Sequence, residues 1–176
     1  MSSIISPWYA IQVKANREWA VTASLMSRGL EASCPAYREA RRWSDRVKVI
    51  DVPLFRGYVF ARFNPTQPLI VLTSPGVCRI VGIGSIPAPV DDAEMEVIQA
   101  VARSDMARIP VEYVAVGQKV IVSQGPLRGS KGILARIKNV DRFVVSISLL
   151  QRSVMVEVPS AWIQPAGDER TLVLSA

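Results

Sequence analysis

The chain has 176 residues, 49% of them hydrophobic and 20% charged, so its composition suits a folded protein with a buried core. It carries 21 basic and 15 acidic residues, and the resulting charge of +6 favours polyanionic partners. It has no histidine, which excludes Ser-His-Asp and Cys-His catalysis and metal sites with imidazole ligands. Because it also lacks a phosphate-loop motif and its carboxylates are scattered, we expect a protein that is not an enzyme and has no metal and no cofactor.

The two cysteines, Cys34 and Cys78, are far apart and form no Cys-x-x-Cys pair. A structural zinc site takes about four ligands, so the sequence cannot build one. We interpret both as small core residues in a reducing compartment, while a single disulfide stays open. The chain shows no secretion signal, and charged residues or prolines interrupt every apolar stretch before it reaches roughly 20 residues. We therefore expect a soluble, cytoplasmic monomer without membrane contact.

The N-terminal residues predict a strand followed by a helix. Aromatic and β-branched residues at positions 8–13 are typical of a strand, and Asn16 then suits a helix N-cap. Four apolar residues follow at spacings of four, three and four, which predicts one apolar face of an amphipathic helix that ends near Gly29. They are Trp19, Ala23, Met26 and Leu30.

Residues 34–52 predict two antiparallel strands joined by a charged tip, and residues 58–63 predict a further strand after a bend. Asn64 and Pro65 suit the cap and the first position of a short helix. A strand at 77–81 and a Gly/Pro-rich loop follow. Asp91 then opens a capping-box pattern before a last helix. One face of this helix carries Met95, Ile98, Val101 and Ala102. These elements predict an α+β domain over residues 1–105, with an antiparallel sheet and flanking helices.

The composition changes after this helix. Residues 106–114 suit a linker, and residues 115–166 contain only short strand-like runs, which predicts a small all-β barrel. These runs are residues 119–123, 132–137, 143–149 and 154–158. We expect the last segment, residues 167–176, to be a flexible tail.

Three patterns in this order resemble the NusG family of transcription elongation and antitermination factors. They are Trp8-Tyr9 at the first strand, the run Pro-Leu-Phe-Arg-Gly-Tyr-Val-Phe at 53–60, and the glycine-rich run at 117–132. The resemblance extends from about residue 7 to 165. It implies a NusG N-terminal (NGN) domain followed by a KOW domain, which is a small SH3-like barrel. The short hairpin and the early aromatic pair also resemble specialised, RfaH-like paralogues.

The resemblance implies a non-enzymatic factor that binds the clamp helices of RNA polymerase and opposes pausing and termination. The aromatic residues at the matching positions are Trp8, Tyr9, Phe55 and Tyr58. Read from the residues alone, strand aromatics are more often core residues, and alternation places the first two on opposite faces of their strand. The family usually has proline where this chain has Arg56, and the sequence does not decide what this charge does.

Basic residues gather in the predicted hairpin, interleaved with Tyr37 and Trp43. They are Arg38, Arg41, Arg42, Arg46 and Lys48. Guanidinium groups can contact phosphates and an aromatic ring can stack on an unpaired base, and the family places this hairpin near upstream or non-template DNA. The alternative is a solvated, charged tip. Lys14 and Arg28 match the region where sequence-reading relatives contact a DNA hairpin.

The run Gly125, Pro126, Leu127 and Gly129 predicts a structural turn, because glycines permit positive φ and proline fixes φ. The family's KOW domain recruits either Rho or a small-subunit ribosomal protein, and no residue here chooses between them. A helix over 118–136 would contain Pro126 and three glycines at a cost of roughly 6 kcal/mol, so we expect this domain to stay β. The rival function is a ribosome- or RNA-binding KOW protein, which would leave the first domain unexplained.

Overall fold

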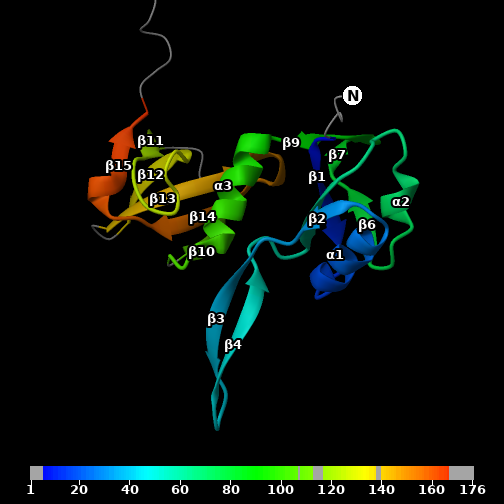
Figure 1. Ribbon diagram of the computed structural model, residues 1–176, viewed down its shortest axis with the longest axis horizontal. Coiled ribbons are helices and arrows are strands. Elements are labelled where there is room, and N and C mark those ends of the chain that lie inside the picture. Colours follow the sequence, from blue (N-terminus) through cyan, green and yellow to red (C-terminus); the bar gives the residue numbers. More distant parts are fainter. Residues whose placement is uncertain (1–5, 107, 113–116, 138–139, 167–176) are drawn as a thin grey trace, which may run out of the picture.

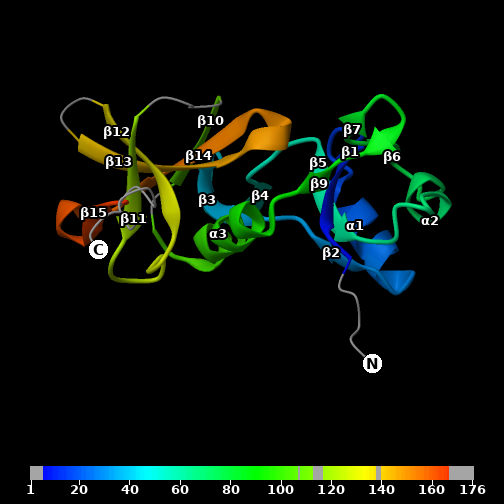
Figure 2. The same ribbon diagram turned by 90° about the horizontal axis from the view of Figure 1, so that it is seen from above.

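The computed structural model describes residues 6–106, 108–112, 117–137 and 140–166 (Figure 1). Two sheets lie side by side, and a helix, α3 (Asp92–Arg103), lies between them (Figures 1 and 2). A hairpin projects away from both sheets (Figure 1). The molecule therefore has two packed halves and one arm.

The N-terminal sheet is antiparallel and has the order β2-β5-β1-β6, with β9 also paired to β1. Its strands are β1 (Trp8–Val13), β2 (Glu31–Ser33), β5 (Tyr58–Arg62), β6 (Val77–Ile80) and β9 (Pro89–Val90). Five of the six β1 residues are buried, because helices cover both faces of this sheet. The predicted strands at 8–13, 58–63 and 77–81 are confirmed, whereas β2 and β9 were not expected.

Helix α1 (Glu18–Ser27) buries a different face from the one that its apolar spacing predicted. Val21 and Leu25 are fully buried, whereas Trp19 and Met26 are about half exposed, at 47% and 58%. The buried face also contains Glu18, whose Oε1 accepts a 2.8 Å hydrogen bond from the backbone N–H of Gly57. Because that bond satisfies a buried carboxylate, the helix can turn a polar residue inward.

The starts of the three helices follow different local rules. Asn16 was expected to cap α1, but it lies in the left-handed region with φ of 60°, and the residue before the helix makes no side-chain capping bond. Helix α2 (Leu69–Leu72) begins later than predicted, because Asn64 forms a turn in which its Oδ1 accepts from the Thr66 N–H at 3.0 Å. Asp91 caps α3 as predicted, accepting from the Ala93 N–H at 2.8 Å.

No helix in the described part of the chain has the length and apolar character needed to cross a membrane.

Two hairpins extend from the N-terminal half. Strands β3 (Ala36–Arg42) and β4 (Val47–Pro53) form the predicted charged hairpin, with Ala36 opposite Pro53 at its root and Arg42 opposite Val47 near its tip. Strands β7 (Gly82–Ile83) and β8 (Ile86–Pro87) form a small hairpin in the stretch that was expected to be a loop.

The C-terminal half is a six-stranded antiparallel sheet with the order β10-β14-β13-β12-β11-β15. Its elements are β10 (Arg108–Glu112), β11 (Gln118–Val122), β12 (Lys131–Ile137), β13 (Val140–Ile147), β14 (Arg152–Glu157) and β15 (Ile163–Pro165), with 3-10 turns at Ser148–Leu150 and Ser160–Trp162. The four predicted strands are confirmed. The pairings of the described residues leave β10 and β15 as edges, so the sheet is open where a closed barrel was expected.

The segment expected to be a linker, residues 106–114, contains strand β10, which pairs with β14 along its whole length. Pro110 lies in this strand. An edge strand such as β10 tolerates proline, because it needs hydrogen bonds to a partner on one side only. The expected tail, residues 167–176, lies outside the described residues.

Helix α3 joins the two halves through a shared core. Met95, Ile98 and Val101 are fully buried as predicted, in a cluster that contains both Trp8 and the C-terminal Phe143. The Glu94 carboxylate does not complete a capping box. It accepts instead from the N–H and hydroxyl of Ser148 in the C-terminal half, the hydroxyl at 2.5 Å.

Candidate nucleic-acid interface

The register of the β3–β4 hairpin sorts its residues onto two faces, because directly opposite residues share a face. One face carries the pair Arg41 and Lys48, and the rung beyond it carries Trp43 and Arg46, joined by a 2.8 Å backbone hydrogen bond. The other face carries Arg38 with Asp51, then Ala40 with Val49, then Arg42 with Val47. We call the first of these the Arg41 face.

The charges on the hairpin are exposed and only partly paired. Arg41 contacts Glu39 at 3.2 Å, and Arg38 lies 4.0 Å from Asp51. Among the described residues, Arg42, Arg46 and Lys48 have no ion pair. Trp43 is 61% exposed at the tip. An arm with uncompensated positive charge and an open indole can meet phosphates and unpaired bases.

Lys14 and Arg28 lie apart from the hairpin. Lys14 is exposed in the turn before α1. Arg28 follows α1, and its Nη1 donates to the Ile70 carbonyl at 3.1 Å and to the Thr73 hydroxyl at 2.9 Å. Arg28 therefore holds the end of α2 in place, which gives this side chain a structural contact in addition to any contact with DNA.

The four predicted aromatic contacts divide between the two faces of the N-terminal sheet. Trp8 and Phe55 belong to the cluster beneath α3, with Tyr58 packed against it. Tyr9 belongs to the cluster beneath α1, where its ring is tilted against that of Phe63 with 4.7 Å between the ring centroids. Trp8, Tyr9 and Phe55 are each only 4% exposed, while Tyr58 is half-buried. Tyr58 is therefore the member that a partner can reach in this conformation.

Arg62 anchors Trp8 and was not predicted from the sequence. Its guanidinium lies 4.8 Å above the Trp8 ring, and it pairs with Glu31 at 3.4 Å and Asp92 at 3.2 Å. Its Nη1 also donates to the Ser6 carbonyl at 2.7 Å. The only signal in the sequence is that Arg62 ends a strand whose other residues are apolar, so its partners could not have been named.

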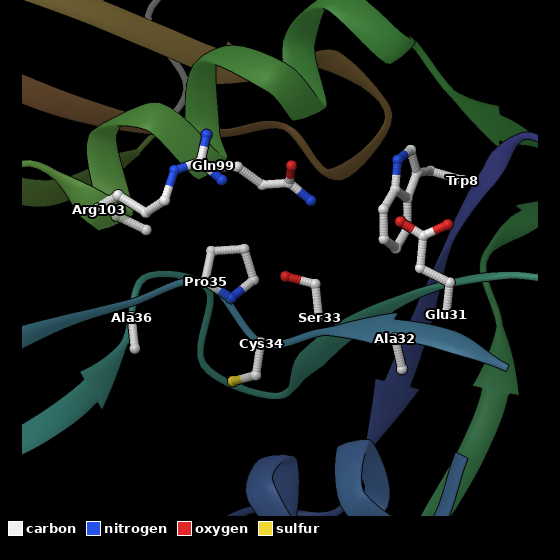
Figure 3. Close-up of a pocket in the computed structure, with 10 residues that line it drawn as sticks. Trp8, Glu31, Ala32, Ser33, Cys34, Pro35, Ala36, Gln99 and Arg103 are labelled. Atoms are coloured by element: carbon white, nitrogen blue, oxygen red, sulfur yellow. The ribbon is translucent and has the colours of Figure 1, made fainter. Parts of the chain in front are cut away.

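A pocket of about 310 Å³ lies beside this network (Figure 3). Gln99 and Arg103 of α3 form one wall, and the segment from Ser33 to Pro35 forms the other. Burial and the nearby Glu18 carboxylate raise the pKa of Cys34 to about 12, so its thiol is a poor nucleophile. Within the described residues, no cluster of acidic or cysteine side chains could hold a metal ion.

The turn between β11 and β12 is structural, as the sequence predicted. Gly125 and Gly129 have φ of 76° and 85°, and the Gly129 N–H donates to the Val122 carbonyl at 2.7 Å. A Cβ on Gly125 would lie 2.2 Å from the Trp162 ring. Leu127 is buried and Pro126 is exposed, so the turn closes over the sheet with its leucine inward.

Together these features define a class of protein: a small α+β half that projects a basic hairpin, followed by an all-β half. The family model described as "Transcription termination factor nusG" matches residues 6–99, which include the whole hairpin and the aromatic set. The chain belongs to the NusG family. Proteins of this family are non-enzymatic transcription termination and antitermination factors that act with RNA polymerase.

Two known proteins agree with this assignment. The transcription termination/antitermination protein NusG of Campylobacter jejuni is 24% identical over 163 residues, covering 86% of this chain and 92% of that protein. A solved structure of Thermotoga maritima NusG has a TM-score of 0.52 and 22% identity, and it covers 92% of this chain and 97% of that one. The structural likeness shows a common fold.

Proposed function

We propose that this NusG-family factor binds RNA polymerase through its aromatic set, with the half-buried Tyr58 in direct contact and Trp8 and Phe55 packed behind it. The target is the pair of clamp helices in the largest subunit, and Tyr9 supports the contact from the opposite face of β1. The observation that carries the proposal is the family match, which covers all four aromatic residues. Tyr58, half-buried beside the buried Trp8 and Phe55, offers a rigid aromatic surface of the kind that dominates interface energies.

The same proposal assigns the hairpin to DNA close to the polymerase. In support, the hairpin extends away from the two cores and exposes Arg42, Arg46 and Lys48 to solvent (Figure 1). Upstream duplex and the non-template strand are the polyanions available there. The C-terminal sheet then recruits a second partner as a KOW domain, either Rho or a small-subunit ribosomal protein.

Within the family, the proposal favours a specialised, RfaH-like antitermination factor over a general one, because each strand of the hairpin has only seven residues. The position of the gene tests this part of the proposal. A place at the head of a polysaccharide operon supports it, whereas a place among general transcription and translation genes argues against it.

Binding to purified core polymerase, free of nucleic acid, tests the aromatic contact. Tyr58→Ala is expected to weaken binding by about 1–3 kcal/mol, because it removes an interface aromatic, while Tyr58→Phe keeps most of the affinity. Ile83→Ala is a matched control, since Ile83 is 81% exposed on the separate β7–β8 hairpin. If Tyr58→Ala binds as tightly as the wild type, the contact lies elsewhere.

A further inference from the structure

A second basic and aromatic feature lies at the root of the hairpin. A groove of about 250 Å³ separates β4 and the end of β3 from the first turn of α1. Trp19 and Asn16 line it from the α1 side, Arg41 and Ile50 from the hairpin, and Arg56 from the bend that follows β4. Two regions that are distant in sequence, residues 16–19 and 41–56, thus place one indole and two guanidinium groups around one hollow.

Trp19 is exposed because of the way its helix packs. Its helix packs on the sheet through Val21 and Leu25, which turns the indole outward and leaves 47% of it exposed. A large apolar ring beside cationic groups, open to solvent on one side, suits stacking against another flat ring. A nucleobase is such a ring, and stacking on aromatic side chains is how proteins hold unpaired bases.

The two arginines of the groove are available to phosphates. Arg56 is exposed and makes no hydrogen bond or ion pair with any described residue. Arg41 pairs only with Glu39, and side chains of both residues are about half exposed. Exposed ion pairs of this kind contribute little to stability. Arg41 can therefore release the Glu39 carboxylate and bind a phosphate at small cost.

The two carboxylates of the groove differ in their surroundings. Glu18 is 5% exposed, and its Oε1 accepts from the Gly57 N–H at 2.8 Å. Asp51 lies 4.0 Å from Arg38. The groove therefore presents two exposed guanidinium groups and one exposed carboxylate, that of Asp51, because Glu18 is buried.

The groove continues onto the hairpin. Arg41 belongs both to the groove and to the Arg41 face, where Lys48 lies directly opposite and Trp43 and Arg46 form the next rung. The groove and the Arg41 face therefore form one continuous strip. It begins at the exposed Trp19, crosses Arg41 and Lys48, and ends at the exposed Trp43. Alternating cations and aromatic rings are the pattern of surfaces that bind single strands. Stacked bases inside a duplex cannot reach Trp19, whereas an unpaired base can.

We propose that the groove binds an unpaired nucleotide of a single-stranded nucleic acid. Trp19 stacks on the base, Arg41 and Arg56 bind the flanking phosphates, and the strand continues along the Arg41 face to Trp43. This inference rests on the proposed contact between the hairpin and nucleic acid, and it adds the groove and the preference for single strands. Non-template DNA and RNA share the chemistry that the groove recognises.

Fluorescence anisotropy of the full chain with labelled oligothymidine, oligouridine and a DNA duplex, each of about 12 nucleotides per strand, tests the inference. Trp19→Ala and Arg56→Gln are each expected to weaken single-strand binding by about tenfold and to leave duplex binding unchanged. Trp19→Phe should retain most of the affinity. Met26→Ala is the matched control, because Met26 is also exposed on α1 but does not line the groove.

The outcomes separate the groove from the hairpin. If Trp19→Ala and Arg56→Gln bind single strands like the wild type while Arg41→Ser/Arg42→Ser/Arg46→Ser loses binding, the groove inference is wrong and the hairpin contact stands. If that triple variant also binds single strands normally, both the groove inference and the proposed hairpin contact are wrong. A larger loss on oligothymidine supports the groove with non-template DNA as its ligand, and a larger loss on oligouridine supports it with RNA. Equal unfolding midpoints confirm folding, and Arg56→Gln decides the case if Trp19→Ala is destabilised.

Discussion

Cys34 and Cys78 differ sharply in environment at the residue scale. Cys34 is half-buried, and burial followed by the Glu18 charge raises its pKa from 9.0 to about 12, whereas Cys78 is exposed on the N-terminal sheet. We expect a disulfide reagent at pH 8 to modify Cys78 rapidly and Cys34 only after unfolding. Single Cys→Ala variants identify which thiol has reacted. Equal rates for the two thiols in the folded protein would contradict this account.

The raised pKa of Cys34 also affects stability. Because the folded pKa lies above the unfolded value, the contribution of the protonated thiol is complete below about pH 9 and is lost as pH rises toward about 12. The wild type should therefore lose more of its unfolding free energy than Cys34→Ala over this interval. Parallel curves for the two proteins would exclude this effect.

Phe55 is a core residue in this structure as well as a proposed polymerase contact. It is 4% exposed and packs edge-on against Phe60, with 5.8 Å between the ring centroids. Phe55→Ala is therefore expected to lower the free energy of unfolding by about 3–5 kcal/mol in urea denaturation, and Phe55→Leu by clearly less. A loss below about 1 kcal/mol for Phe55→Ala would mean that the ring is not part of the core. For this reason Tyr58 is the cleaner probe of polymerase binding.

The face of α1 shows where single-residue reasoning from sequence failed. Trp19, Ala23 and Met26 had the right spacing for a buried stripe, but Val21 and Leu25, four residues apart, fit one equally well. The stripe that is buried also contains Glu18, whose carboxylate is satisfied by the Gly57 N–H from a distant bend. No local pattern shows that hydrogen bond, so the sequence could not predict that Trp19 would line a groove.

At the scale of elements, the hairpin is the feature that the sequence predicted best. Its strand alternation and charged tip are local, and both were found where expected. Elements whose ends depend on local chemistry were also predictable, as Asp91 at the start of α3 shows. The edge strands β10 and β15 were missed, because an edge strand is defined by its partner and not by its own sequence.

Changing the hairpin tests its proposed role at the same scale. Replacing Arg41, Arg42 and Arg46 with Ser should reduce the slope of log affinity for duplex DNA against log salt by about 0.9 for each phosphate that the variant no longer binds. The physical reason is that fewer counterions are released on binding. Arg128→Ser is the matched control, since Arg128 is an exposed arginine in the β11–β12 turn. If the triple variant keeps the wild-type slope, the hairpin is only a solvated tip.

At the scale of the whole molecule, α3 makes the two halves one structure. It packs on β13, and Glu94 accepts two hydrogen bonds from Ser148, 54 residues away. The sequence indicated a boundary near residue 105 from the change in composition, and it contained no sign of this contact. The family resemblance predicted the order of the two halves. It could not predict how they pack, because that packing depends on complementary side chains far apart in the sequence.

The C-terminal half is expected to keep its strands in solution. Strands β11 and β12 cover most of the segment from 118 to 137, and the turn between them needs positive φ at Gly125 and Gly129. A helical form would have to accommodate both glycines and Pro126. Backbone chemical shifts of the full-length protein should be those of strands through this segment. Helical shifts there would overturn the expectation.

Co-purification with the tagged full-length chain, expressed in cells of its own source, tests the central claim most directly. We predict that the subunits of RNA polymerase are recovered with the wild type and that their yield falls with Tyr58→Ala but not with Ile83→Ala. Nuclease treatment should leave this recovery intact, because the main contact is with protein. Recovery of ribosomal subunits without polymerase would contradict the account and would favour a ribosome- or RNA-binding protein instead.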